Sequence, residues 1–219
     1  VTPEVHLTSM ALLMIVLNFA IRSDLMDMPD SDSGGATFSL PKGPLLGMAF
    51  ISFCVFLCEG AVADWSAVYL LNTLDGSPFV AGLGYAGFAL MMTLGRFQGD
   101  SIVAFFGAKR LLQFGALLGA IGVAMAVLIP IPAVAILGFT LLGLGFSSLV
   151  PIIFRAAANV PGIASGTGIA AVTTAGTFGL LSGPPLIGFV AEGFGLTIGL
   201  AVVAALAFLA SLLARTVKA

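Results

Sequence analysis

Two carboxylates stand in one of the most apolar stretches of the chain, CEGAVADWSAVYL, which begins at Cys58. They are Glu59 and Asp64, and the whole sequence of 219 residues contains only ten acidic and eight basic side chains. A carboxylate in such surroundings can carry a proton, bind a polar solute or pair with a group on a neighbouring helix. Which of these it does depends on the elements that hold it.

The composition indicates that those elements are helices in a membrane. Apolar residues make up 59% of the chain and charged residues 8%, against about 45–50% and about 25% in soluble domains. The 28 glycines suit helices that pack closely inside a bilayer. The apolar runs are continuous rather than alternating, which disfavours a β-barrel. The predicted fold class is therefore an all-α integral membrane protein.

Six apolar segments come close to the roughly 20 residues that a membrane-spanning helix needs. Short turns with Gly, Pro or charged residues separate them. The predicted segments are 44–72, 78–94, 111–128, 132–154, 165–190 and 196–213. Before them we expect the end of a truncated transmembrane helix in residues 1–21 and a polar linker in residues 22–43. Residues 44–219 are expected to form a six-transmembrane-helix bundle.

The positive charges predict how this bundle is oriented. If each segment crosses the membrane once, all Lys and Arg residues fall on one side, and the turns on the other side contain none. Basic residues near helix ends mark the cytoplasmic face. The linker and the C-terminus are therefore expected in the cytoplasm. The residues counted are Arg22, Lys42, Arg96, Lys109, Arg110, Arg155, Arg215 and Lys218.

A charged motif, GRFQGDSIVAFFGAKRLL, lies between the second and third full segments. Glycines in it allow two helix ends to approach closely, and its basic pair stands at the predicted cytoplasmic boundary. Arg96 and Asp100 are four residues apart, a spacing at which a helix brings opposite charges together. The residues of the motif are Gly95, Arg96, Gly99, Asp100, Gly107, Lys109 and Arg110.

This motif resembles the loop signature of the major facilitator superfamily. The stretch GLLSGPPLIG, with Gly183, Pro184 and Pro185, is similar to a Gly- and Pro-containing element of helices in that family. The stretch EGAVADW resembles the seventh helix of a bacterial branch related to fucose permease. The resemblance covers residues 44–219 and implies the C-terminal half of a twelve-helix fold. Residues 1–21 would then be the end of helix six.

The resemblance also implies a function. Members of this family carry solutes through a site between two six-helix halves, and their loop motif acts as a cytoplasmic gate. Implied partners are a small-molecule substrate, the lipid bilayer and an N-terminal six-helix half, with protons as the candidate coupling ion and no nucleic acid. A bacterial inner membrane is the implied location, and Pro184 and Pro185 are expected to kink their helix.

Glu59 and Asp64 are expected at different depths. At about 1.5 Å per residue from position 45, Glu59 lies about 21 Å up, just past the middle of a bilayer, and Asp64 about 28 Å up, at its outer surface. They also point about 140° apart on a regular helix, so both face one cavity only if the helix breaks, which Gly60 would permit. Asp64, beside Trp65, is expected at the outer boundary, and a direct role in a site is the alternative.

The candidate groups for substrate binding or proton coupling are therefore Glu59, Asp64, Trp65 and Tyr85. For Glu59 the alternative is a structural hydrogen bond to a neighbouring helix, and for Tyr85 it is aromatic packing. The leading hypothesis is a secondary transporter half that moves a small polar solute, sugar-like or organic, by alternating access. The alternatives are a drug/proton efflux half and a non-transporting sensor or scaffold. We predict no enzyme activity, cofactor or metal, because no catalytic or ligating cluster lies in the helices.

Overall fold

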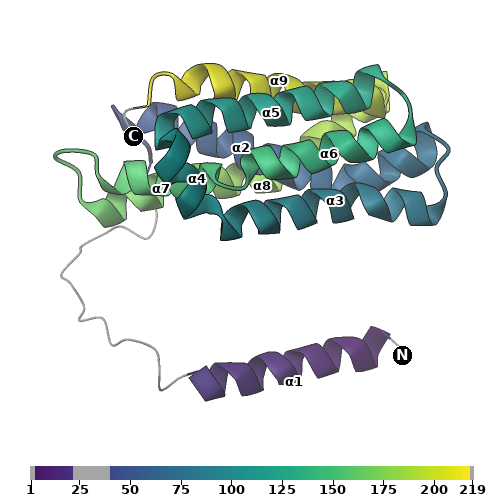
Figure 1. Cartoon of the computed structure of the whole chain (residues 1–219), viewed down its shortest axis with the longest axis horizontal. Coiled ribbons are helices and arrows are strands. Elements are labelled where there is room, and N and C mark those ends of the chain that lie inside the picture. The colour runs from purple at the N-terminus through teal and green to yellow at the C-terminus, as the bar shows by residue number, and fades with distance from the viewer. Residues whose placement is uncertain (1–2, 22–39, 218–219) are drawn as a thin grey trace. The chain divides into compact units, whose positions relative to one another are not determined.

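The computed structural model describes residues 3–21 and 40–217, which fall into two units. The first unit contains one helix, α1, Pro3–Ile21, which matches the leading apolar segment (Figure 1). Its described side chains, from Glu4 to Ala20, are all exposed. That α1 ends a membrane-spanning helix stays a prediction, and most of the predicted linker lies outside the described residues.

The second unit is a bundle of antiparallel helices (Figure 1). Six of its helical stretches are long and apolar enough to cross a membrane, and each coincides with a predicted segment. This confirms the predicted all-α, six-helix fold class. The helices are α2 Leu45–Val68 with a π-helical end Tyr69–Thr73, α3 Pro78–Phe97, α5 Ala108–Leu128, α6 Pro132–Phe146 with α7 Leu149–Ala158, α8 Ser165–Phe194 and α9 Leu196–Ala214.

Local sequence explains where these helices begin and end. Ser77 caps α3 by accepting a hydrogen bond from the backbone N–H of Val80, and Pro78 follows at the first helical position, where its missing N–H costs nothing. Pro132 starts α6 in the same way. Gly107 has φ +80°, a conformation that glycine adopts without strain, and it separates the short helix α4, Gly99–Phe106, from α5.

One feature differs from the sequence expectations, and two others bear on possibilities that the sequence left open. The loop motif contains the helix α4 and not only a turn. Helix α2 continues through Gly60 without a break. Gly60 instead allows close packing, since an added β-carbon would lie 2.8 Å from the carbonyl oxygen of Leu180 in α8. Helix α8 also continues through Pro184 and Pro185; that the prolines kink it stays a prediction.

The contact between α2 and α8 depends on small residues. Glycines of α8 at positions 176, 179 and 183 face α2, and a β-carbon on Gly183 would come within 2.6 Å of the Leu57 carbonyl oxygen. In lipid, such close backbone approach replaces the hydrophobic effect as the source of helix association. The hydroxyl of Ser52 adds a hydrogen bond of 2.9 Å to the Val172 carbonyl oxygen across this contact.

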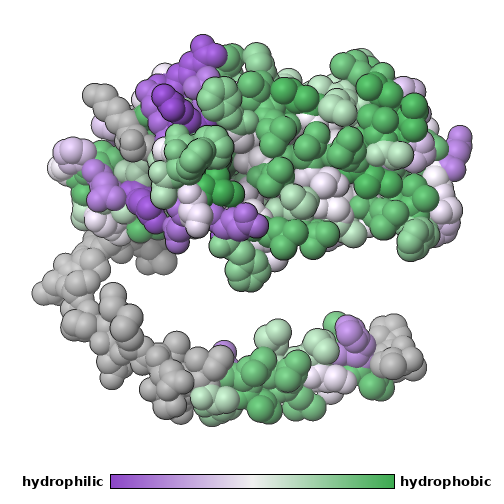
Figure 2. Space-filling model, viewed as in Figure 1, coloured by the Kyte–Doolittle hydropathy of each residue, from purple (hydrophilic) through white to green (hydrophobic). Residues whose placement is uncertain are grey.

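The surface of the bundle matches a lipid environment. On the face that Figure 2 shows, apolar side chains cover the length of the helices, and hydrophilic residues gather at the ends, most of them at the end with α4 and α7. Helices α2 and α5 begin at that end, and helices α3, α7 and α9 end there. All described Lys and Arg residues of the bundle belong to these helix ends, namely Lys42, Arg96, Lys109, Arg110, Arg155 and Arg215. We call it the basic end.

Candidate functional site

Glu59 and Arg96 form the ion pair at the centre of the candidate site. Nη2 of Arg96 lies 3.9 Å from Oε1 of Glu59, and the two side chains are 51% and 15% exposed. Among the described residues, the buried Oε1 atom has no hydrogen-bond donor. The carboxylate is therefore paired in charge, yet it keeps the capacity to accept a hydrogen bond from a ligand.

The α2–α3 hairpin explains this pair. Glu59 stands 14 positions before the end of the α2 helical stretch at Thr73, and Arg96 stands 18 positions after the start of α3 at Pro78. Arg96 is thus about 6 Å closer to the basic end, a distance that its long side chain can span. Sequence reasoning placed Arg96 only in the gate motif and missed this partner. The antiparallel register of the hairpin was the signal that could have found it.

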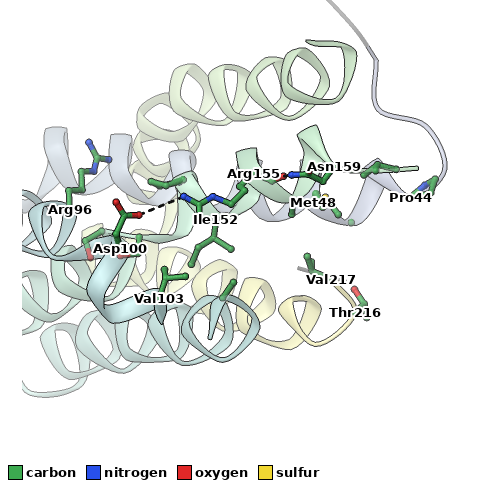
Figure 3. Close-up of a pocket in the computed structure, with 18 of the residues that line it drawn as sticks. Pro44, Met48, Arg96, Asp100, Val103, Ile152, Arg155, Asn159, Thr216 and Val217 are labelled. Carbon is green, nitrogen blue, oxygen red and sulfur yellow. Dashed lines mark hydrogen bonds and ion pairs between the residues drawn. The ribbon is translucent and has the colours of Figure 1, made fainter. Parts of the chain in front are cut away.

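Asp100 has a different partner from the one that its spacing suggested. Within the part of the chain that the structure describes, it pairs with Arg155 of α7 at 3.6 Å and not with Arg96 (Figure 3). The reason is local: α3 ends at Phe97, and Gln98 turns the chain before α4 begins, so Arg96 and Asp100 do not lie on one continuous helix. Both members of the pair are exposed, which limits its contribution to about 1 kcal/mol or less.

The motif glycines bring α3 and α4 against the junction of α6 and α7. A β-carbon on Gly95 would overlap the hydroxyl of Ser147, and one on Gly99 would lie 3.4 Å from Oγ of Ser148. These two serines occupy the junction itself, between the end of α6 and the start of α7. The glycine spacing therefore has a packing role at the basic end, in addition to the turn that Gly107 makes.

A cavity of about 910 Å³ opens at the basic end. Its walls come from the start of α2, from α4, from α7 and from the last described residues of the chain, and the Asp100–Arg155 pair lies across it (Figure 3). Arg96 also lines this cavity, so its side chain connects the space to Glu59. The lining is mainly apolar, with polar groups contributed by these three residues and by Ser147, Ser148, Asn159 and Thr216.

The other predicted site residues lie apart from this pair. Asp64 is exposed, and because α2 is unbroken it stays on a different face from Glu59. Trp65 donates a hydrogen bond of 3.0 Å from Nε1 to the carbonyl oxygen of Pro184, which gives it a packing role between α2 and α8. Tyr85 is half-exposed, with its ring centroid 5.9 Å from that of Phe88. Contact of these three residues with a substrate stays a prediction.

The remaining residues of the two predicted motifs lie in helix contacts or at exposed helix ends. Gly183 packs on Leu57, and Pro184 and Pro185 lie inside α8. Lys109 and Arg110 are exposed in the first turn of α5. Over residues 3–21 and 40–217, no group of three or more His, Cys, Asp or Glu side chains is close enough to hold a metal ion.

This arrangement of helices and charges agrees with comparisons to known proteins. The profile of the Major Facilitator Superfamily matches residues 48–218. The chain is 39% identical over 215 residues to an uncharacterized MFS-type transporter of Yersinia pestis, covering 98% of this chain and 56% of that protein. It is 35% identical over 184 residues to the membrane protein MosC of Rhizobium meliloti, covering 84% and 45%. The chain belongs to the major facilitator superfamily.

Solved structures show the same fold at low identity. The fucose:proton symporter FucP of E. coli matches with a TM-score of 0.80 at 19% identity, covering all of this chain and 59% of that one. The nucleoside transporter NupG matches with a TM-score of 0.69 at 18% identity, covering 81% and 45%. The chain thus spans about half the length of the relatives that it matches.

These findings confirm the predicted family, the half-fold architecture and the multi-pass membrane location. The family consists of transporters and not enzymes, as predicted. The substrate, the coupling ion and the orientation in the membrane belong to the proposal that follows.

Proposed function

We propose that this bundle is the C-terminal half of a secondary active transporter that moves a small polar solute by alternating access. The proposal rests on one observation above all: Glu59, inside a membrane-spanning helix, has a charged partner at 3.9 Å and an oxygen that lacks a hydrogen-bond donor among the described residues. Ionisable groups at such depth usually face a solute or ion pathway.

Glu59 and Arg96 together favour a polar, uncharged or zwitterionic solute. Oε1 of Glu59 can accept a hydrogen bond from a hydroxyl or an ammonium group, and the half-exposed guanidinium of Arg96 can donate to a hydroxyl, carbonyl or carboxylate oxygen. A cationic amphiphile would need a carboxylate whose charge is unopposed. Because Arg96 already opposes the charge of Glu59, a sugar-like solute suits the pair better than a cationic drug.

Glu59 is also the proposed group for proton coupling. Protonation of its carboxylate would release Arg96, whose side chain reaches the cavity at the basic end. The protonation state of Glu59 and the position of the cytoplasmic gate would then be linked through one side chain. In this proposal the basic end faces the cytoplasm, in accord with the distribution of Lys and Arg.

Transport by the full-length protein in proteoliposomes tests the proposal. The probes are radiolabelled fucose, galactose, uridine, lactate and tetraphenylphosphonium, each measured with and without an inward proton gradient. We expect accumulation of a neutral probe that depends on the gradient. Glu59→Gln should abolish this accumulation and leave exchange of labelled for unlabelled solute intact. Gradient-driven accumulation that survives in Glu59→Gln would exclude Glu59 as the coupling group.

A further inference from the structure

A second hollow lies between α4, α5 and the junction of α6 and α7, and it shares only Ser147 and Ser148 with the cavity beside Arg96 and Asp100. This crevice has a volume of about 590 Å³. Apolar side chains from all three elements form its walls, including Phe106 of α4, Phe114 and Leu118 of α5, and Leu144 of α6. The proposed transport function does not use it.

The crevice opens on a face that lipid must contact. Helix α5 is long and apolar enough to span a membrane, and it packs against α6 and α9. On its outer side Phe114 is 58% exposed, and Phe106 of the adjoining α4 is 54% exposed. Large apolar rings exposed side by side in this way mark a surface that contacts lipid or a partner.

Depth along α5 divides the crevice into a charged end and an apolar end. Arg110 lines it in the first turn of α5, with the exposed Lys109 beside it. Phe114 and Leu118 follow about 6 Å and about 12 Å deeper in the membrane. Asp100, the acidic residue of α4, is paired with Arg155 on the other cavity, so it does not neutralise this basic pair. A guanidinium above an apolar slot suits an anionic headgroup joined to an acyl chain.

Ser148 gives a second, independent indication of a ligand. Ser148 belongs to the wall between the crevice and the cavity beside Arg96, since it lines both. The residue is 4% exposed, and its Oγ atom has no hydrogen-bond partner among the described residues. A buried hydroxyl without a partner is costly. Ser148 stands 16 positions after Pro132, and Arg110 stands 18 positions before the end of α5 at Leu128. The two side chains therefore lie at similar depth, where one ligand with several oxygens would meet both.

We propose that this crevice binds one anionic phospholipid from the leaflet at the basic end. Arg110 holds the phosphate, Ser148 donates to an ester or phosphate oxygen, and an acyl chain lies along Phe114, Leu118 and Leu144. Lys109, which is not in the crevice wall, adds positive charge near the headgroup. The lipid would fix α4 and the gate motif relative to α5.

Native mass spectrometry of the detergent-purified protein tests this site. The probes are dioleoyl phosphatidylglycerol, dioleoyl phosphatidylcholine and inorganic phosphate. We expect one tightly retained phosphatidylglycerol per chain and at least about tenfold weaker retention of phosphatidylcholine. Arg110→Gln should weaken phosphatidylglycerol retention by about tenfold or more, because a hydrogen bond to a charged group is lost. Ser148→Ala should weaken it by about threefold, as expected for a neutral hydrogen bond.

Arg215→Gln is the matched control, since Arg215 is an exposed basic residue that follows α9 at the same end and does not line the crevice. Its phosphatidylglycerol retention should stay within about twofold of the unaltered protein. Thermal unfolding in detergent alone should be similar for both arginine variants, which separates binding from folding. Equal losses of phosphatidylglycerol retention in Arg110→Gln and Arg215→Gln would overturn the proposal, because any basic residue at this end would then attract the lipid equally. Retention of inorganic phosphate as tight as that of phosphatidylglycerol would overturn it too, because the site would then bind a free anion.

Discussion

The carboxylate of Glu59 and the guanidinium of Arg96 lie 3.9 Å apart, although the sequence puts one in the middle of a membrane-spanning helix and the other in the gate motif. The pair connects two functions that the sequence presents as separate. It is asymmetric, since the carboxylate is largely buried and the guanidinium is half-exposed. Removal of the arginine should therefore have a larger effect than removal of the acid.

Arg96→Gln should lower stability, because it leaves a largely buried carboxylate without its counter-charge. A fully buried pair loses about 3–5 kcal/mol when one partner is removed, and the exposure of Arg96 reduces the expected loss to about 1–3 kcal/mol. Glu59→Gln should cost less than Arg96→Gln. The double variant Glu59→Gln with Arg96→Gln should be more stable than Arg96→Gln alone, as measured by thermal unfolding in detergent. Additive losses in the double variant would show that the two residues are not coupled.

Gly183→Ala should destabilise the contact between α2 and α8. The new β-carbon would lie 2.6 Å from the carbonyl oxygen of Leu57, so the helices would have to separate, at a cost of about 1–3 kcal/mol. Gly193→Ala is the control in the same helix, because a β-carbon there meets no atom within 4 Å. The control should be neutral or slightly stabilising, since alanine favours helix by up to about 1 kcal/mol. Equal melting temperatures for the two variants would contradict the packing role of Gly183.

Trp65→Phe should remove the hydrogen bond that Nε1 donates to the Pro184 carbonyl oxygen. The ring remains large and apolar, so the expected loss is about 1 kcal/mol in the free energy of unfolding. Phe189→Leu serves for comparison, because Phe189 is exposed on α8 and its replacement should change stability by less than about 0.5 kcal/mol. Unfolding should be followed by circular dichroism, because Trp65 is the only tryptophan of the chain and its replacement removes the tryptophan fluorescence signal. An unchanged melting curve for Trp65→Phe would argue that the tryptophan serves a substrate and not the helix contact.

Cysteine labelling of the intact membrane should separate the two ends of the bundle. A cysteine in place of Lys109, at the start of α5, should react with a membrane-impermeant maleimide only from the cytoplasmic side. One in place of Asp75, in the turn after α2, should react only from outside. The two native cysteines, Cys54 and Cys58, are buried, so they should contribute little background. Reaction of both engineered cysteines from the same side would refute the proposed topology.

Hydropathy alone predicted every membrane-spanning stretch of the bundle, because each needs a long apolar run and the turns between them are short. The predicted ends of these stretches were less accurate. The fourth segment was expected to end at position 154, and α7 continues to Ala158. Helix ends at a membrane surface depend on neighbouring elements as much as on their own residues, and the sequence of one segment does not contain that information.

The candidate site was only partly predictable. Glu59 could be found because a carboxylate in an apolar run needs a physical reason. Its partner Arg96 could not, because the pairing depends on how α2 and α3 are aligned. The same limit explains Asp100, which pairs with Arg155, some 55 positions away, across the cavity that α4 and α7 both line. The role of Gly60 stayed open for a related reason: glycine can permit a bend or a close approach, and only the neighbouring helix α8 shows which of them occurs.

The junction of α6 and α7 has a mechanical consequence. At Ser147 the backbone N–H bonds to the carbonyl oxygen of Leu144, three residues back, at 3.4 Å, so the regular ladder of the α-helix is interrupted inside the fourth span. A helix bends most easily where its ladder is interrupted. Tilting α7, which carries Arg155, therefore requires less distortion than tilting one rigid rod, and α6 can keep its packing on α5 while the short segment swings.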